Sequence, residues 1–313
     1  MSGGAFDTAI EDDGTRLLGP YRRPLQMLAE QVYDDHASIH DDATAQKLGF
    51  KGGTIEGPTH FSQIVPLCVA QWGADWLAEG CLSVQYRNAC YEGDATRAVL
   101  DKPAAGARVA AIRIERDDGL EVLRGTASIG AGERTAIDEK LAGLSPPEPR
   151  VILRDVSVGM RRPRVTVRMD ADTKMGKLYP FSLNDKLSRI TETSPLYCTN
   201  TGPWGRPIIP FEMISVLVHH IADGDPWVVR GPRVDLFTDQ EIRLLKGPLF
   251  VGEAYEVERE VIALSGSRRT ESLWIKSSIF APGSDQCLAS MVLNVASLKD
   301  SYADYERALA QLS

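Results

Sequence analysis

An acid and an imidazole stand five positions apart in the N-terminal part of the chain, at Asp35 and His40. Both groups accept and return protons near neutral pH, so a water molecule held between them would be activated for attack. The segment from Asp35 to His40, DHASIH, is too polar and irregular to predict a helix. It could curl so that both side chains enter one cavity. We take the pair as the candidate catalytic centre; the alternative is that both are ordinary surface residues.

A backbone donor follows at Gly57, directly before an apolar stretch that predicts a helix. Its N–H would point outward beside the positive end of the helix dipole, and glycine lets a ligand approach the backbone closely. Two neighbours are open to two interpretations each. Glu56 is either a solvated carboxylate near the helix start or a third acid in the pocket. His60 either packs in the core, which the sequence favours, or faces the same cavity.

Metal and nucleotide cofactors are not expected. His36 and His40 have the HxxxH spacing that binds metal when helical, but the sequence contains no HExxH motif and no evident third ligand. No glycine-rich phosphate loop lies in a convincing strand–turn–helix context. The sequence therefore predicts chemistry that needs neither a redox cofactor nor ATP.

Composition limits the class of protein. A chain of 313 residues, 43% hydrophobic and 25% charged, is typical of a globular protein with two domains. A net charge of −8 argues against nucleic acid as a partner. Arg161, Arg162 and Arg164 lie in a strand-like stretch, where a solvated strand face is favoured over a phosphate contact. The N-terminus lacks an apolar signal segment and no stretch is long enough to span a membrane, so we expect a cytoplasmic protein. The cysteines are scattered and predict no disulfide framework: Cys68, Cys81, Cys90, Cys198 and Cys287.

The chain repeats one plan twice. Gly19 and Gly176, each in a short turn before a Leu-Tyr or Pro-Tyr pair, are 157 positions apart, and DHASIH has its counterpart ETSPLY at the same offset. Each half then has a Gly-rich turn, an apolar helix and several strands. We therefore predict two domains, 1–148 and 149–313, joined at the proline-rich stretch 146–150.

The sequence of each half predicts one mostly buried helix followed by strands. This is an α+β arrangement in which a curved sheet wraps the helix. The first helix carries apolar residues on most sides from Phe61 to Trp76, and Pro66 should kink or break it. The polar amphipathic tail, SYADYERALAQL, predicts a closing helix. Strands are predicted at 82–87, 96–100, 108–116 and 122–129 in the first half, and at 234–237, 241–245, 254–264, 272–280 and 291–296 in the second.

The first half resembles the MaoC-like, (R)-specific enoyl-CoA hydratases (hydratase 2), whose motif reads D-x-N-P-x-H-x-D, then A-x-x-x-G-F, then H-G before a helix. Here it reads DHASIHDD from Asp35, then Ala45 with Gly49-Phe50, then Glu56-Gly57. The motif's Asn and Pro are replaced by Ala37 and Ser38, and its second His by Glu56. The resemblance covers most of the first half and, more weakly, the second. It implies a double hot-dog chain, two fused hot-dog domains that imitate the dimer of single-domain relatives.

The resemblance also implies roles. Asp35 and His40 would jointly position and deprotonate the water that adds to an enoyl thioester, with CoA as the expected carrier, and the Gly57 N–H would hold the thioester oxygen. We expect Glu56, His60, Tyr86 and Arg87 to bind substrate. In the second half Glu192, Tyr197 and Phe211 replace the acid, the imidazole and the glycine. We therefore expect a degenerate half that shapes the acyl pocket, and His219 and His220 to cap its helix.

Two other functions stay open at this stage. The altered motif leaves room for another hot-dog enzyme, either a thioesterase or a dehydratase of an unusual polar or cyclic substrate. The chain could also be a non-catalytic subunit that binds acyl groups for a partner enzyme. Two double hot-dog chains could pair as a homodimer.

Overall fold

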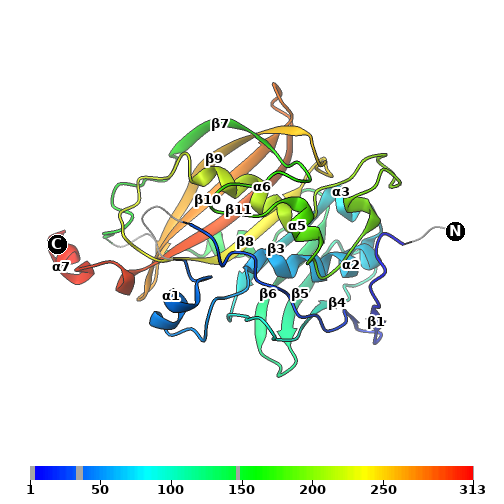
Figure 1. The fold of residues 1–313 in the computed structure, drawn as a ribbon, viewed down its shortest axis with the longest axis horizontal. Coiled ribbons are helices and arrows are strands. Elements are labelled where there is room, and N and C mark those ends of the chain that lie inside the picture. Colours follow the sequence, from blue (N-terminus) through cyan, green and yellow to red (C-terminus); the bar gives the residue numbers. More distant parts are fainter. Residues whose placement is uncertain (1–3, 33–37, 146–148, 313) are drawn as a thin grey trace.

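The computed structural model describes residues 4–32, 38–145 and 149–312, and within them the chain is α+β. One long antiparallel sheet runs through the molecule, with the main helices against one face (Figure 1). Its strands lie in the order β1-β2-β4-β5-β6-β3-β8-β11-β10-β9-β7. First-half strands therefore occupy one end of the sheet and second-half strands the other.

The first half contributes six of these strands. They are β1 (Glu11–Asp12), β2 (Arg16–Leu18), β3 (Gly80–Tyr86), β4 (Thr96–Asp101), β5 (Val109–Arg116) and β6 (Glu121–Ile129). The helices are α1 (Asp42–Lys47), a 3-10 helix (Gly57–His60), α2 (Phe61–Trp72), α3 (Trp76–Glu79) and α4 (Ala136–Ala142).

The second half repeats the plan with longer strands. They are β7 (Arg161–Arg168), β8 (Asp235–Leu244), β9 (Ala254–Gly266), β10 (Thr270–Phe280) and β11 (Cys287–Leu298). The α-helices are α5 (Leu183–Leu187), α6 (Met213–His219) and α7 (Tyr305–Ala310). Short 3-10 helices cover Pro195–Tyr197, His220–Ala222 and Lys299–Ser301.

The strand order confirms the internal duplication. Strands β3, β6, β5 and β4 lead away from the centre on one side, and β8, β11, β10 and β9 lead away on the other. At the centre β3 pairs antiparallel with β8, with Val84 opposite Gln240. The two halves thus meet edge to edge, and each closes the open sheet edge of the other. The boundary at 148/149 remains a prediction, because residues 146–148 lie outside the described residues.

The buried helix of each half lies where its apolar pattern predicts. Helix α2 packs on β4 and is buried from Phe61 through Cys68, so both of its sides contact protein. It runs through Pro66 without a break. Helix α6 is shorter and continues as a 3-10 turn, in which the Nδ1 of His220 bonds the Leu217 carbonyl at 2.9 Å. That contact confirms the predicted capping role of His220, whereas the Nδ1 of His219 instead contacts the Tyr179 hydroxyl at 2.9 Å.

One strand prediction was wrong. The segments 234–237 and 241–245 are not separate strands, because β8 runs unbroken from Asp235 to Leu244. The polar residues Asp239 and Gln240 lie between the two predicted strands, yet both are buried at the centre of the sheet. Asp239 pairs with Lys140 and accepts a bond from Asn294, while Gln240 bonds Tyr86 and Ser215. Their polar groups are satisfied by partners distant in sequence, which the local pattern does not reveal.

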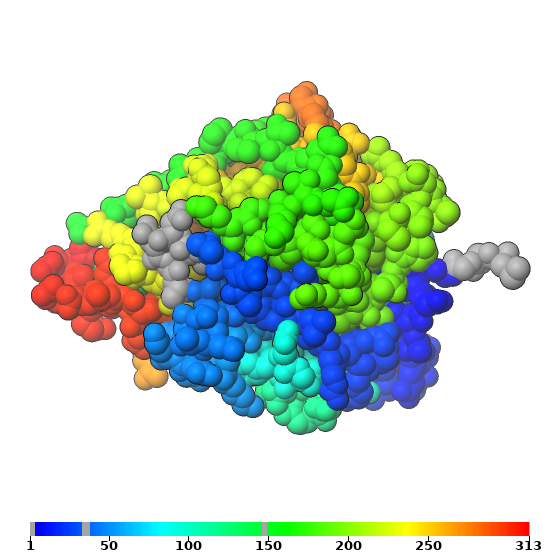
Figure 2. Space-filling view, viewed as in Figure 1, coloured from blue at the N-terminus to red at the C-terminus, as the bar shows by residue number. Residues whose placement is uncertain are grey.

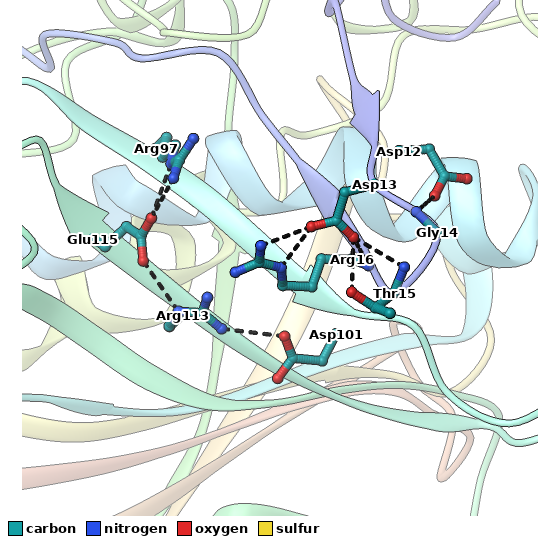
Figure 3. Close-up of polar contacts among 9 residues, drawn as sticks. All are labelled: Asp12, Asp13, Gly14, Thr15, Arg16, Arg97, Asp101, Arg113 and Glu115. Carbon is teal, nitrogen blue, oxygen red and sulfur yellow. Dashed lines mark hydrogen bonds and ion pairs between the residues drawn. The ribbon is translucent and has the colours of Figure 1, made fainter.

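Charged ladders cover the outer strands. Arg97 on β4 and Glu115 on β5 are directly opposed and form an ion pair at 2.8 Å, and Glu115 also meets Arg113 (Figure 3). The turn between β1 and β2 is held by Asp13, which bonds Arg16. Arg161, Arg162 and Arg164 of β7 each pair with an acid. No helix in the described ranges is long and apolar enough to cross a membrane.

Candidate functional site

A cavity of about 330 Å³ is lined by residues of both halves, and we call it the shared cavity. From the first half it receives the segment Ser38–His40, the 3-10 helix Gly57–His60 and the end of β3. From the second half it receives Lys186 of α5 and the start of α6. The second half thus supplies one wall of the cavity, as the sequence predicts.

His40 is held with one ring nitrogen engaged. Its Nδ1 lies 2.7 Å from the backbone carbonyl oxygen of Thr54. A carbonyl only accepts, so Nδ1 carries the hydrogen and Nε2 keeps a lone pair. The backbone is fixed as well, because Gln26 donates to the His40 carbonyl at 2.7 Å and Ser38 Oγ accepts from its N–H. The imidazole therefore lines the cavity in a tautomer suited to accepting a proton. Asp35 lies outside the described residues, so its position relative to His40 is not described.

Gly57 begins the 3-10 helix that leads into α2, and it also lines the cavity. Within the described ranges, no acceptor lies within hydrogen-bond reach of its N–H. A Cβ atom at this position would lie 2.4 Å from the ring of Tyr86. Glycine is therefore required by the close approach of that ring, and the role of its N–H as a donor to substrate remains a prediction.

The interpretation of Glu56 as a solvated carboxylate is wrong. Its exposed fraction is 8%, and it accepts bonds from the Met27 N–H at 2.8 Å and from the Thr59 hydroxyl at 3.3 Å. It lines the shared cavity with His60, which is buried with 1% exposed. His60 therefore faces the cavity, whereas the sequence favoured simple packing.

Tyr86 and Arg87 line the cavity at the end of β3. The hydroxyl of Tyr86 donates to Gln240 at 2.6 Å, and burial raises the pKa of this phenol. Arg87 is exposed and bonds Gln85. The substrate-binding roles of both residues remain predictions.

Sequence reasoning missed Lys186 and Glu212, two buried charged residues of the cavity wall. Lys186 donates to Thr59 at 2.8 Å and lies 3.6 Å from Glu212. Burial raises the pKa of Glu212 to about 7, with Lys186 opposing the shift and Glu56 adding to it. A lone acid in the apolar stretch IIPFEMISVLV was the one signal for Glu212. No sequence pattern near Lys186 predicts that it lies in the cavity wall.

A metal site is not supported within the described ranges, where no group of three His, Cys, Asp or Glu side chains could hold an ion. His36 lies outside those ranges, so the HxxxH pair is not described. In the cavity wall, Glu212 lies 3.6 Å from Lys186, whose charge also acts on His60.

Comparison with solved structures identifies the fold. A MaoC domain protein dehydratase from Chloroflexus aurantiacus matches with a TM-score of 0.56 at 12% identity, over 94% of this chain and 95% of that one. A second structure, described as a MaoC-like dehydratase, matches with a TM-score of 0.50 at 16% identity, over 91% and 97% of the two chains. The chain has the double hot-dog fold of MaoC-like dehydratases.

Other comparisons add little to this double hot-dog assignment. The dehydratase domain of PpsC from Mycobacterium tuberculosis, in complex with C12:1-CoA, matches at 8% identity over 94% and 98% of the two chains, with a TM-score of 0.46. No family model matches the sequence, and no curated protein does. The likeness therefore lies in the fold rather than in the amino-acid sequence.

In the second half, the residues at the positions of Asp35 and His40 are buried and have partners. Glu192, at the position of the acid, is buried and bonded to Arg22 at 2.7 Å and to Thr8. Tyr197, at the position of the imidazole, is buried against Phe6. The N-terminal segment that supplies these contacts (blue) crosses this face between the halves (Figure 2).

The glycine of the first half has an apolar replacement. Phe211, in its place, packs on Phe61 and Trp76 with ring centroids 6.3 and 5.0 Å apart. Phe211 therefore packs the second half against the first.

Proposed function

We propose that this protein is a hydro-lyase that adds water to, or removes it from, an enoyl or 3-hydroxyacyl thioester, with CoA as the carrier. The observation that carries the proposal is that His40 and Gly57 line one cavity, and that neither the Nε2 of His40 nor the N–H of Gly57 has a hydrogen-bond partner among the described residues. The fold of MaoC-like dehydratases supports the same assignment.

The assigned chemistry follows from these groups. His40 Nε2, acting with Asp35, removes a proton from water as the water oxygen bonds to C3 of the enoyl group. Electron density moves to the thioester oxygen, which accepts a hydrogen bond from the Gly57 N–H. The proton then returns to C2, so water has added across the double bond and nothing is oxidised. In the reverse direction the same groups expel water.

The test is an absorbance assay with crotonyl-CoA and longer enoyl-CoA thioesters, in which hydration removes the conjugated double bond. His40→Gln and Asp35→Asn should each lower kcat/KM by about 10²–10⁴-fold, the usual contribution of a general acid–base group. Asp75→Asn is the matched control, because Asp75 is exposed and its side chain makes no capping bond. Thermal unfolding of each variant reports whether it is folded.

Three results would refute the assignment. Release of free CoA without loss of the double bond would identify a thioesterase. Tight acyl-CoA binding with no turnover of any thioester would identify a binding subunit. Hydration that persists in His40→Gln would place the chemistry elsewhere.

A further inference from the structure

The shared cavity contains a second group of polar side chains that the proposed hydration step does not use. It consists of Thr59, His60, Lys186 and Glu212, and we call it the inner polar cluster. All four line the cavity, and their exposed fractions are 6%, 1%, 5% and 2%. Thr59 and His60 come from the first half, and Lys186 and Glu212 from the second. The cluster therefore forms only where the two halves meet.

Much of the hydrogen-bonding capacity in this cluster is unused. Within the described ranges, neither carboxylate oxygen of Glu212 and neither ring nitrogen of His60 has a hydrogen-bond partner. The ammonium of Lys186 lies 3.6 Å from Glu212, too far for a hydrogen bond, and donates to the Thr59 hydroxyl instead. A buried polar group without a partner is unfavourable, because it has lost its hydrogen bonds to water.

Burial and charge select the chemistry of a ligand that would satisfy the cluster. The one cation of the cluster, Lys186, lies 3.6 Å from Glu212, and the negative charge of Glu56 helps to raise the pKa of Glu212. An anionic substituent would add a further negative charge to that set, and an added cation would compete with Lys186. A purely apolar substituent would leave the polar atoms of Glu212 and His60 unpaired.

An uncharged hydroxyl meets these conditions. Its hydrogen can be donated to Glu212, or to an imidazole nitrogen of His60, and its oxygen can accept from Lys186. We propose that the inner polar cluster binds a hydroxyl group carried on the acyl chain of the substrate, beyond the carbons that react. This inference rests on the proposed function, since it assumes that the acyl group of a thioester enters the shared cavity.

The test compares binding of saturated acyl-CoAs, which cannot be hydrated, in pairs of increasing length. Each pair contains a terminal-hydroxyl chain and a methyl-ended chain with the same number of non-hydrogen atoms. At the length that reaches the cluster, the hydroxyl-ended ligand should bind at least tenfold more tightly by calorimetry. Sites built to bond a hydroxyl strongly reject analogues that lack it.

Variants connect this preference to the cluster. The double variant Lys186→Met with Glu212→Leu replaces the charged pair by apolar side chains of similar volume, a change that is often neutral for stability. It should bind the methyl-ended ligand more tightly than the hydroxyl-ended one. Lys140→Met is the control, because Lys140 pairs with Asp239 and neither residue lines the shared cavity. The control should keep the wild-type preference.

The outcomes separate this inference from the proposed function. A hydroxyl preference that the double variant reverses supports the inference even where no enoyl-CoA is hydrated. Hydration of enoyl-CoA without a hydroxyl preference at any length leaves the hydro-lyase standing and overturns the inference. Tighter binding of a carboxyl-ended chain, an unchanged preference in the double variant, or no binding of any acyl-CoA would also overturn it.

Discussion

The ring of Tyr86 lies against Gly57 so closely that a Cβ atom on the glycine would be 2.4 Å from ring carbons Cε1 and Cζ. Gly57→Ala should therefore displace either the ring or the start of the 3-10 helix. We expect unfolding free energy to fall by about 1–3 kcal/mol, the range for an overpacked site. Urea titration of the wild type and the variant measures it.

A double-mutant cycle tests whether the loss of stability in Gly57→Ala comes from the Tyr86 ring. In a Tyr86→Leu background the smaller side chain gives room, so the cost of Gly57→Ala should shrink markedly. Gly143→Ala is a control, because its Cβ would meet only atoms at 3.7 Å. An equal cost of Gly57→Ala in both backgrounds would contradict the predicted clash.

Tyr86→Phe should destabilise the protein through a buried partner. The Tyr86 hydroxyl donates to Gln240 Oε1 at 2.6 Å across the central strand pair, and Gln240 is fully buried. Removing the donor leaves that oxygen unpaired, so we expect a loss of about 1–3 kcal/mol in unfolding free energy. Tyr91→Phe is the control, because the Tyr91 hydroxyl accepts a longer bond, 3.3 Å, from an exposed loop. An equal loss in both variants would argue against the buried acceptor.

Much of the fold could be predicted from the sequence, because the signals were local and repeated. Burial alternates along β9, and α2 has apolar residues on nearly all sides. Such periodic patterns can be read from the sequence of a single strand or helix. The repeat offset predicted the two-part plan that the sheet order confirms. The strand that contains Asp239 and Gln240 was not predicted as one strand, because the partners of these buried polar residues are distant in sequence.

The residues of the site also fall into two groups, those with a local sequence signal and those without one. His40, Gly57 and their neighbours follow one another in a short stretch, so a motif could point to them. Lys186 and Glu212 reach the cavity from separate elements of the other half, and only the packing of the two halves brings them to Thr59 and His60. No local sequence pattern predicts a buried lysine, because its burial depends on partners that other parts of the fold supply.

The thiols should differ in reactivity because of burial. Cys198 is exposed, whereas Cys68 and Cys81 are buried, and burial raises the pKa of both buried thiols. The thiolate is the reactive form, so a disulfide reagent should modify Cys198 first in the folded protein. Cys198→Ser should remove the fast phase of thiol titration, and denaturant should expose the slow thiols. Cys287 is half-buried and should react at an intermediate rate, so fast modification of Cys68 or Cys81 in Cys198→Ser would contradict the described burial.

Glu212 should make the protein less stable as pH rises. Burial raises the pKa of its carboxyl to about 7, against a usual value near 4.5. Between these values the folded state binds more protons than the unfolded state, so the unfolding free energy falls with increasing pH. The contribution is fully present below about pH 4.5 and lost through pH 7.

Comparison with Glu212→Gln isolates this contribution, because the amide does not titrate. Unfolding free energy of the wild type minus that of the variant should fall by up to about 3 kcal/mol over this window, at about 1.4 kcal/mol for each pKa unit. Denaturant titrations at several pH values measure the difference. A flat or rising difference would refute the prediction.

His60 should act in the opposite direction. Burial, with the nearby charge of Lys186, lowers the pKa of His60 to about 3. An unfolded histidine titrates near 6.5, so between pH 6.5 and 3 the unfolded state binds more protons and stability falls as the solution is acidified. In His60→Gln this loss should be absent. The wild type should therefore lose up to about 4–5 kcal/mol relative to the variant over that window. Acid titrations of unfolding free energy test it, and parallel curves would mean that His60 is protonated or solvated in the folded protein.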